Sequence, residues 1–285
     1  MTDLQTLREY YAEELRAVGN LQSEAVVRAF AKVPREHFLG PGPWQVRSPG
    51  FEGYWTTKNA DPKHLYHNVL VAIDPSRWLN NGHPSFLASL IDRLNVKPMD
   101  RVIHVGCGTG YYTAIMAEVV GREGHVAAIE VDIQLAARAR NNLNYLPNVE
   151  VIYGDGGETD AGPADAILVN AGATHPRAIW LDSLRPGGRL IVPLTVTDAN
   201  GGGGGHVLKV SRHPGGLEAS FISGVGIFSC VGSRDAELNQ RLKDAFERDD
   251  WKSVQSLRRD LHEPTDTCWL HATDFCLSKL PIESE

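Results

Sequence analysis

The sequence lacks the features that mark nucleic-acid-binding and membrane proteins. Its 28 lysines and arginines are outnumbered by 35 aspartates and glutamates, and the net charge of −7 offers no basic excess for phosphates. It contains no apolar run of about 18 residues, and its charged N-terminus has no apolar signal core. We therefore expect a cytoplasmic protein with no nucleic-acid partner and no membrane partner.

Cysteine is scarce and irregularly spaced. No C-x-x-C pair, the pattern typical of zinc-binding and redox motifs, occurs among the four cysteines Cys107, Cys230, Cys268 and Cys276. The sequence predicts reduced thiols, without a disulfide framework or a zinc knuckle, and no metal site.

The first hundred residues combine helical and irregular segments. Apolar residues recur at helical spacing over 4–32, with a break near Gly19, and again over 84–94. Residues 40–66 are rich in Gly, Pro and Trp without a period, which predicts an extended loop. Residues 65–74 alternate weakly and predict a strand or hairpin.

From residue 100 onward, strand and helix patterns alternate. This βαβ alternation indicates a mostly parallel sheet with helices on both faces. The predicted strands cover 101–106, 125–131, 149–155, 164–172 and 189–194, and the predicted helices cover 111–121, 134–146 and 175–188.

The last third of the chain follows a different pattern. Residues 206–213 and 222–231 flank a turn and predict antiparallel strands, while the glycine run 201–205 predicts a flexible hairpin tip. One helix is predicted over 235–248, and the rest of the tail predicts a small appended element.

The stretch VIHVGCGTGYY (102–112) carries the clearest motif. Gly106, Gly108 and Gly110 form G-x-G-x-G, which lets the backbone turn sharply and approach a ligand at a helix N-terminus. Glu130 ends the next strand, where nucleotide-binding motifs place an acidic residue for ribose hydroxyls. The alternative is a tight strand–helix turn without a ligand. It is weakened by GDG (154–156), whose carboxylate can meet an adenine amino group.

Five motifs together resemble a known family. VPREHF, GCGTGYYTA, GDGGE, ADAILVNAGA and SLRPGGRLIVPL, in this order and spacing, are similar to the protein-L-isoaspartate O-methyltransferases, which belong to the class I S-adenosylmethionine (SAM)-dependent methyltransferases. The similarity covers roughly residues 5–232. It implies an α/β fold: a Rossmann-like, doubly wound, seven-stranded and mostly parallel sheet with one antiparallel strand, an N-terminal helical segment and a C-terminal extension.

The resemblance also implies a cofactor site for SAM, with S-adenosylhomocysteine as product. The glycine turn would face the methionine part, Glu130 would hold the ribose, and Asp155 would lie near the adenine. Residues 1–99 would form the N-terminal helical and substrate-loop region, 100–232 the SAM-binding core and 233–285 the extension. The predicted cofactor-binding residues are His104, Gly106, Gly108, Gly110, Glu130, Asp155, Gly156 and Asn170.

Two positions depart from the family pattern. His104 stands where members usually carry an acidic residue. A neutral histidine there can hydrogen-bond a loop group, or cofactor binding is weaker and pH-sensitive. Members also carry a serine two residues before a proline, and counting back from Pro84 places Gly82 at that position. The hydroxyl near the transferred methyl group is therefore missing.

Neighbours of Gly82 can supply the lost contact, and the predicted catalytic positions are Asn81, Gly82 and His83, with Asn80 and Ser85 as further candidates. His83 can also act as a base for another nucleophile, or be only a capping residue. A carboxylate needs no strong base, because it is already a nucleophile at pH 7.

The expected function is therefore methyl transfer to a carboxylate, on an isoaspartyl peptide or on another peptide or small molecule. The alternatives are a methyltransferase for a different nucleophile, a non-catalytic module that binds SAM or peptide, and an NAD-dependent oxidoreductase. The oligomeric state does not follow from the sequence.

Overall fold

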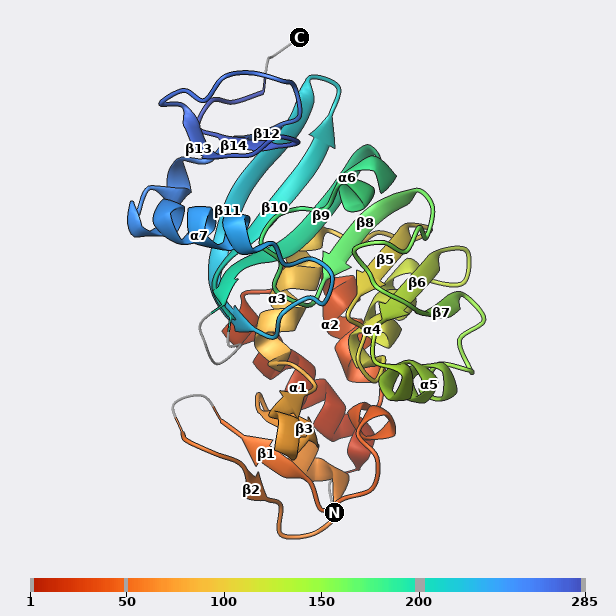
Figure 1. The fold of residues 1–285 in the computed structure, drawn as a ribbon. Helices are drawn as coiled ribbons and strands as arrows, with labels where there is room; N and C mark the ends of the chain where they lie inside the picture. The colour runs from red at the N-terminus through yellow and green to blue at the C-terminus, as the bar shows by residue number, and fades with distance from the viewer. Residues whose placement is uncertain (1–2, 49–50, 198–202, 283–285) are drawn as a thin grey trace. The chain divides into compact units, whose positions relative to one another are not determined.

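The structure is a computed structural model with two compact units, shown in Figure 1 and described one at a time. The first unit consists of the residues up to Asp100 together with Cys107–Tyr153, and the second consists of Arg101–Gly106 and the residues from Gly154 onward. The described residues are 3–48, 51–197 and 203–282.

The first unit combines an N-terminal helical part, a small antiparallel sheet and a strand–helix–strand segment. The small sheet has the order β2-β1-β3-β4, and β6 pairs with β7 in parallel. Its elements are α1 (Leu4–Gly19), α2 (Glu24–Lys32), η1 (Arg35–Phe38), β1 (Gln45–Arg47), β2 (Trp55–Thr56), η2 (Pro62–Leu65), β3 (Leu70–Asp74), η3 (Pro75–Arg77), β4 (Leu79–Asn80), α3 (Pro84–Leu94), α4 (Tyr111–Val120), β6 (His125–Glu130), α5 (Ile133–Asn142) and β7 (Val149–Tyr153).

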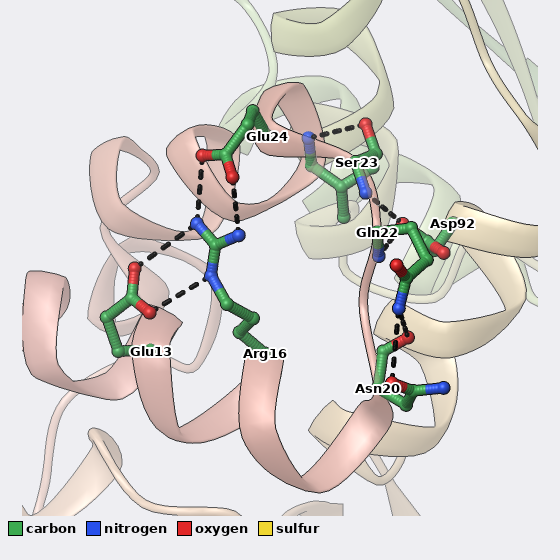
Figure 2. A network of polar contacts seen from close by, with 8 residues as sticks. Glu13, Arg16, Asn20, Gln22, Ser23, Glu24 and Asp92 are labelled. Atoms are coloured by element: carbon green, nitrogen blue, oxygen red, sulfur yellow. Dashed lines mark hydrogen bonds and ion pairs between the residues drawn. The ribbon is translucent and has the colours of Figure 1, made fainter.

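The predicted helical region 4–32 and its break near Gly19 are confirmed as α1 and α2. Polar contacts fix the connection between them (Figure 2). Arg16 reaches both Glu13, at 3.0 Å, and Glu24, at 2.5 Å. Asp92 of α3 accepts the backbone N–H groups of Gln22 and Ser23 at 3.1 and 2.7 Å. The contacts of Asp92 tie α3, whose N-terminus follows the segment of Gly82, to the connection between α1 and α2.

The predicted loop over 40–66 was wrong, because this stretch contains β1, β2 and η2. Its apolar side chains have a small core of their own. Trp44 and Val46 are buried with Leu39, Leu65 and Val71. A long-range cluster of this kind has no local periodicity, so the sequence pattern did not reveal it.

The second unit is built on a sheet whose order is β13-β14-β12-β11-β10-β9-β8-β5. The strands β5, β8 and β9 pair in parallel, and the strands from β10 onward pair antiparallel. Its elements are β5 (Arg101–Val105), β8 (Ala164–Val169), α6 (Ala178–Ser183), β9 (Leu184–Thr197), β10 (Gly203–His213), β11 (Gly216–Ile227), α7 (Ala236–Glu247), η4 (Trp251–Ser253), β12 (Ser256–Arg258), β13 (Cys268–His271) and β14 (Cys276–Ser278).

The α/β class is confirmed in both units, since parallel strands alternate with helices along the chain. The predicted count of seven strands left out β12, β13 and β14, which belong to the C-terminal extension and continue the sheet of the second unit (Figure 1). The predicted helix over 235–248 is confirmed as α7. Within the described parts of the chain, no helix is long and apolar enough to cross a membrane.

The predicted helix over 175–188 was too long. Only α6 is helical there, and the chain is already extended at Leu184, which pairs with Ala164. Pro186 accounts for this, because it disfavours helical backbone at the preceding residue.

The glycines 203–205 are not a hairpin tip, because they lie inside β10; residues 201 and 202 fall outside the described residues. Gly205 pairs with Thr195 of β9 on one side and Val225 of β11 on the other. A Cβ on Gly205 would lie 2.1 Å from the carbonyl oxygen of Leu194. Close strand packing, rather than a turn, therefore requires this glycine.

Candidate active site

The glycine turn of the first unit leads into α4. Gly108 and Gly110 have φ values of +57° and +95°, in the left-handed region that glycine enters without a penalty. A Cβ on Gly110 would lie 2.7 Å from Cδ1 of Leu143. A Cβ on Gly108 would meet no heavy atom of the described residues within 4 Å, so a ligand can approach its backbone closely.

Glu130 supports this turn from the end of β6. Its Oε2 accepts the N–H of Gly108 at 2.7 Å, and its Oε1 accepts the N–H of Asp132 at 3.1 Å. The side chain is buried, and this burial raises its pKa, while the two N–H groups oppose the rise. A carboxylate has about four acceptor positions, so roughly two remain for ribose hydroxyls.

The second unit carries the other predicted cofactor residues. Gly106 follows β5 with φ +74°, and its Cβ position lies 3.4 Å from the carbonyl oxygen of Asn170. Asn170 follows β8 and donates its N–H to the carbonyl of Val105 at 2.8 Å. Gly106 and Asn170 are therefore adjacent at the carboxyl ends of neighbouring parallel strands, where open α/β sheets bind ligands.

Asp155 and Gly156 form a tight turn in the second unit. The carboxylate of Asp155 accepts the N–H of Gly157 at 2.8 Å, and a Cβ on Gly232 would lie 1.7 Å from its Oδ2. A Cβ on Gly156 would lie 2.2 Å from Cγ1 of Val105, so only glycine fits there. The adenine role of Asp155 stays a prediction.

His104 is fully buried in β5, opposite Leu168 of β8. Burial lowers the pKa of His104 to about 3. The imidazole is therefore neutral throughout the physiological pH range. The alternative that His104 makes cofactor binding pH-sensitive near neutrality is not supported.

Gly82 of the first unit lies against α4. It has φ +82°, and its carbonyl accepts the hydroxyl of Tyr112 at 3.2 Å. Its N–H donates to Oδ1 of Asn80 at 2.9 Å. A Cβ on Gly82 would lie 3.3 Å from Cε2 of Tyr112 and 3.4 Å from Cδ2 of Leu87. The backbone conformation therefore favours glycine at this position, where the resemblance predicts a serine.

Arg35 is a residue whose role the sequence reasoning missed. Its guanidinium is fully buried and donates to Oδ1 of Asn81 at 2.9 Å and to the carbonyls of Leu65 and Val69 at 2.7 and 2.8 Å. The ion pairs found among the described residues do not include it. The only signal in the sequence was the position of Arg35 within VPREHF, a motif that ends a helical region.

Asn81 is oriented by Arg35 and still has an unused donor. Its Oδ1 is taken by the guanidinium, and its own N–H donates to the carbonyl of Val71 at 2.9 Å. The side-chain Nδ2 is buried and has no hydrogen-bond partner among the described residues. A buried amide of this kind is an available donor for a substrate oxygen.

His83 is also oriented by its neighbours. Its Nδ1 lies 3.3 Å from Oγ of Ser85, and that oxygen accepts from Nδ2 of Asn68 at 3.0 Å. In the tautomer with the ring proton on Nε2, the hydroxyl of Ser85 donates to Nδ1, whereas in the opposite tautomer Nδ1 donates. Nε2 is buried without a partner among the described residues. Burial, and secondarily the charge of Arg35, lower the pKa of His83.

Comparisons with known proteins identify the class of protein first. The structure is similar to a solved protein-L-isoaspartate O-methyltransferase, with a TM-score of 0.64 and 24% identity over 89% of this chain and 73% of that one. It is also similar to a solved Plasmodium falciparum protein described as a putative protein-L-isoaspartate O-methyltransferase in complex with S-adenosyl-L-homocysteine. There the TM-score is 0.59, with 21% identity over 78% of this chain and 97% of that one. The fold is therefore that of the α/β methyltransferases.

The sequence comparison identifies the family. Residues 58–201 match the family described as protein-L-isoaspartate(D-aspartate) O-methyltransferase (PCMT). The protein-L-isoaspartate O-methyltransferase of Methanopyrus kandleri is 32% identical over 66% of this chain and 76% of its own length. This chain belongs to the PCMT family. The predicted enzyme class, a SAM-dependent methyltransferase, is confirmed at the level of the family.

Proposed function

We propose that this chain transfers the methyl group of SAM to a carboxylate of a peptide, and that Asn81 and His83 bind this carboxylate. Membership of the PCMT family favours an isoaspartyl side chain as the acceptor. The observation that carries the proposal is the pair of buried donors, Nδ2 of Asn81 and Nε2 of His83, which have no partner in the described part of the chain.

The reaction itself needs few groups. The carboxylate oxygen attacks the methyl carbon in line, the carbon–sulfur bond breaks, and its electron pair goes to sulfur. The products are a methyl ester and the neutral thioether S-adenosylhomocysteine, and no proton is transferred. Positioning therefore dominates catalysis. Two N–H donors and the buried charge of Arg35 suit an anionic acceptor.

The same geometry separates this proposal from methylation of an alcohol or amine. Such a nucleophile needs a base, and Nε2 of His83 carries the ring proton when Ser85 donates to Nδ1. In our proposal His83 is a hydrogen-bond donor at every pH above its lowered pKa. The alternative role as a base for another nucleophile requires the opposite tautomer.

The cofactor residues are part of the proposal. In the first unit, the backbone of the turn at Gly108 and Gly110 binds the methionine part, and Glu130 binds the ribose hydroxyls with the acceptor positions that Gly108 and Asp132 leave open. A peptide is the preferred partner over a small molecule, since this family is named for protein substrates. We place the enzyme in the cytoplasm, where thiols such as its free cysteines stay reduced.

Two variants of His83 test this assignment with isoaspartyl peptide and methyl-labelled SAM. His83→Gln keeps an N–H donor and should retain most of kcat/KM, whereas His83→Leu should lose about 10- to 100-fold, as should Asn81→Ala, because each loses a hydrogen bond to a charged group. His64→Leu, which changes a histidine of the same unit outside this segment, should leave activity unchanged.

The pH profile gives an independent readout. With His83 as a donor, kcat/KM on the peptide is flat from pH 7 to 9. A rise with pH that disappears in His83→Gln, or equal loss in His83→Gln and His83→Leu, would show that His83 is a base and that the acceptor is another nucleophile. SAM binding without transfer to any peptide would support the non-catalytic alternative.

A further inference from the structure

The C-terminal extension brings together four side chains of the kind that bind metals. His262, Cys268, His271 and Cys276 each offer one nitrogen or sulfur atom, and these four atoms all lie within 4.8 Å of one another. His262 lies in the irregular chain after β12, Cys268 and His271 lie on β13, and Cys276 begins β14. All four belong to the second unit and lie outside the family match of residues 58–201.

A β-bulge explains how β13 contributes two of these side chains. Residues three apart on a regular strand point to opposite faces. The register of β13 against β14 shifts between Cys268 and Leu270, so Cys268 opposes Ser278 while His271 opposes Cys276. The extra residue turns Cys268 and His271 to the same side, which is the usual structural consequence of a bulge.

The distance between Cys268 and His262 fits two ligands of a tetrahedral zinc ion. Sγ of Cys268 lies 3.6 Å from Nε2 of His262. With Zn–S bonds of about 2.3 Å and Zn–N bonds of about 2.0–2.1 Å, tetrahedral geometry separates sulfur from nitrogen by roughly 3.5–3.6 Å. The rings of His262 and His271 are 4.7 Å apart at their centroids, inclined by 70°, so both can turn a nitrogen toward one point.

The surrounding contacts orient the ligands. Nδ1 of His262 lies 3.0 Å from the carbonyl oxygen of Asp260, which holds Nδ1 as the donor and leaves Nε2 as the free base. The carboxylate of Asp260 is fixed by two bonds from Arg258, at 3.0 and 2.5 Å. The backbone N–H of Thr265 lies 3.4 Å from Sγ of Cys268, a contact that favours the thiolate.

His271 supplies an independent sign that a group is bound. Its Nδ1 is buried and has no hydrogen-bond partner among the described residues. Buried polar atoms in native proteins are almost always paired, so an unpaired ring nitrogen on a residue of this cluster indicates a ligand.

We propose that His262, Cys268, His271 and Cys276 bind one structural Zn²⁺. Four protein ligands close the coordination sphere, which distinguishes such a site from a catalytic one that keeps a position for water. Two thiolates and two imidazoles select zinc over magnesium or calcium, which prefer oxygen. The ion ties the irregular chain at His262 to the β13–β14 hairpin.

The metal content of the full chain tests this proposal. Protein purified with zinc and then dialysed should contain roughly one zinc per chain by mass spectrometry of the metal. Cys268→Ser and Cys276→Ser should lose it, whereas Cys230→Ser, which changes a buried cysteine outside the cluster, should keep it. Cobalt in place of zinc should give the intense visible bands of tetrahedral coordination and a thiolate charge-transfer band.

One further pair of variants guards against misfolding as the cause of metal loss. His262→Cys keeps four zinc ligands and should retain the ion, whereas His262→Ala should not. Chelation should also accelerate proteolysis of the wild-type chain after β12, with no effect on His262→Ala. Protein that stays metal-free after purification with zinc, a disulfide between Cys268 and Cys276, or zinc retained in both serine variants would overturn the proposal.

Discussion

Replacing Gly82 by serine would introduce the residue that the resemblance predicts at this position, and we predict that it destabilises the fold without raising the methyltransferase activity. Gly82 has φ +82°, and its Cβ position lies 3.3 Å from Tyr112 and 3.4 Å from Leu87. A serine at this position would therefore have to adopt a left-handed backbone conformation, and its Cβ would make tight contacts with the buried side chains of Tyr112 and Leu87. In our account Asn81 and His83 already bind the acceptor carboxylate.

The cost follows from these two effects. An L-residue in the left-handed region costs about 1–2 kcal/mol, and tight contacts of this kind raise the total to about 1–3 kcal/mol. At about 2–4 °C of Tm per kcal/mol in larger domains, the Tm falls by several degrees. Because the strain comes from the backbone and Cβ, Gly82→Ala should lose as much stability as Gly82→Ser.

The assay combines denaturant unfolding with methyl transfer to an isoaspartyl peptide. Gly162→Ala is a matched control, since Gly162 has φ +79° but no described atom within 4 Å of its Cβ position, and it should show the backbone cost alone. A Gly82→Ser variant as stable as wild type with a tenfold higher kcat/KM would refute the reasoning. It would mean that the segment relaxes to accept the hydroxyl.

Three further predictions concern the cofactor region. Glu130→Gln weakens the acceptor for the N–H of Gly108 at 2.7 Å, and calorimetry should show at least about tenfold weaker SAM binding. Gly156→Ala would place a Cβ 2.2 Å from Val105, so denaturant unfolding should show a loss of about 1–3 kcal/mol. The pKa of His104 is about 3 in the folded protein. Between pH 6.5 and 3, His104 is therefore protonated in the unfolded chain but not in the folded one. Stability should fall by about 1.4 kcal/mol per pH unit from 6.5 toward 3, and His104→Gln should lose this dependence.

Local patterns predicted the elements that local sequence determines. The helices α1, α2 and α3 follow from apolar spacing, and the glycine turn follows from three glycines between a buried strand and a helix. The prediction was wrong where contacts with residues distant in the sequence determine the structure. Gly205 was predicted to lie in a flexible tip because its pairing with β9 and β11 cannot be recognised from the local sequence.

In the candidate site, too, features determined by the local sequence were predicted and features determined by long-range contacts were not. Asn81, Gly82 and His83 were predicted because a short motif places them before Pro84, and their roles stay predictions. Arg35 was missed because Asn81, its partner, is 46 residues away. The proposed zinc site could not be predicted from the sequence either. Its four ligands come from a loop and two strands, and a bulge at Trp269 brings two of them to one side.

The bond formed in the product tests the central claim most directly. Isoaspartyl peptide is incubated with methyl-labelled SAM and the protein, and the labelled peptide is then exposed to mild base. Transfer to a carboxylate predicts a methyl ester, so the label should leave the peptide as methanol. Label that stays on the peptide after base would show an ether or N-methyl product and would contradict methylation of a carboxylate.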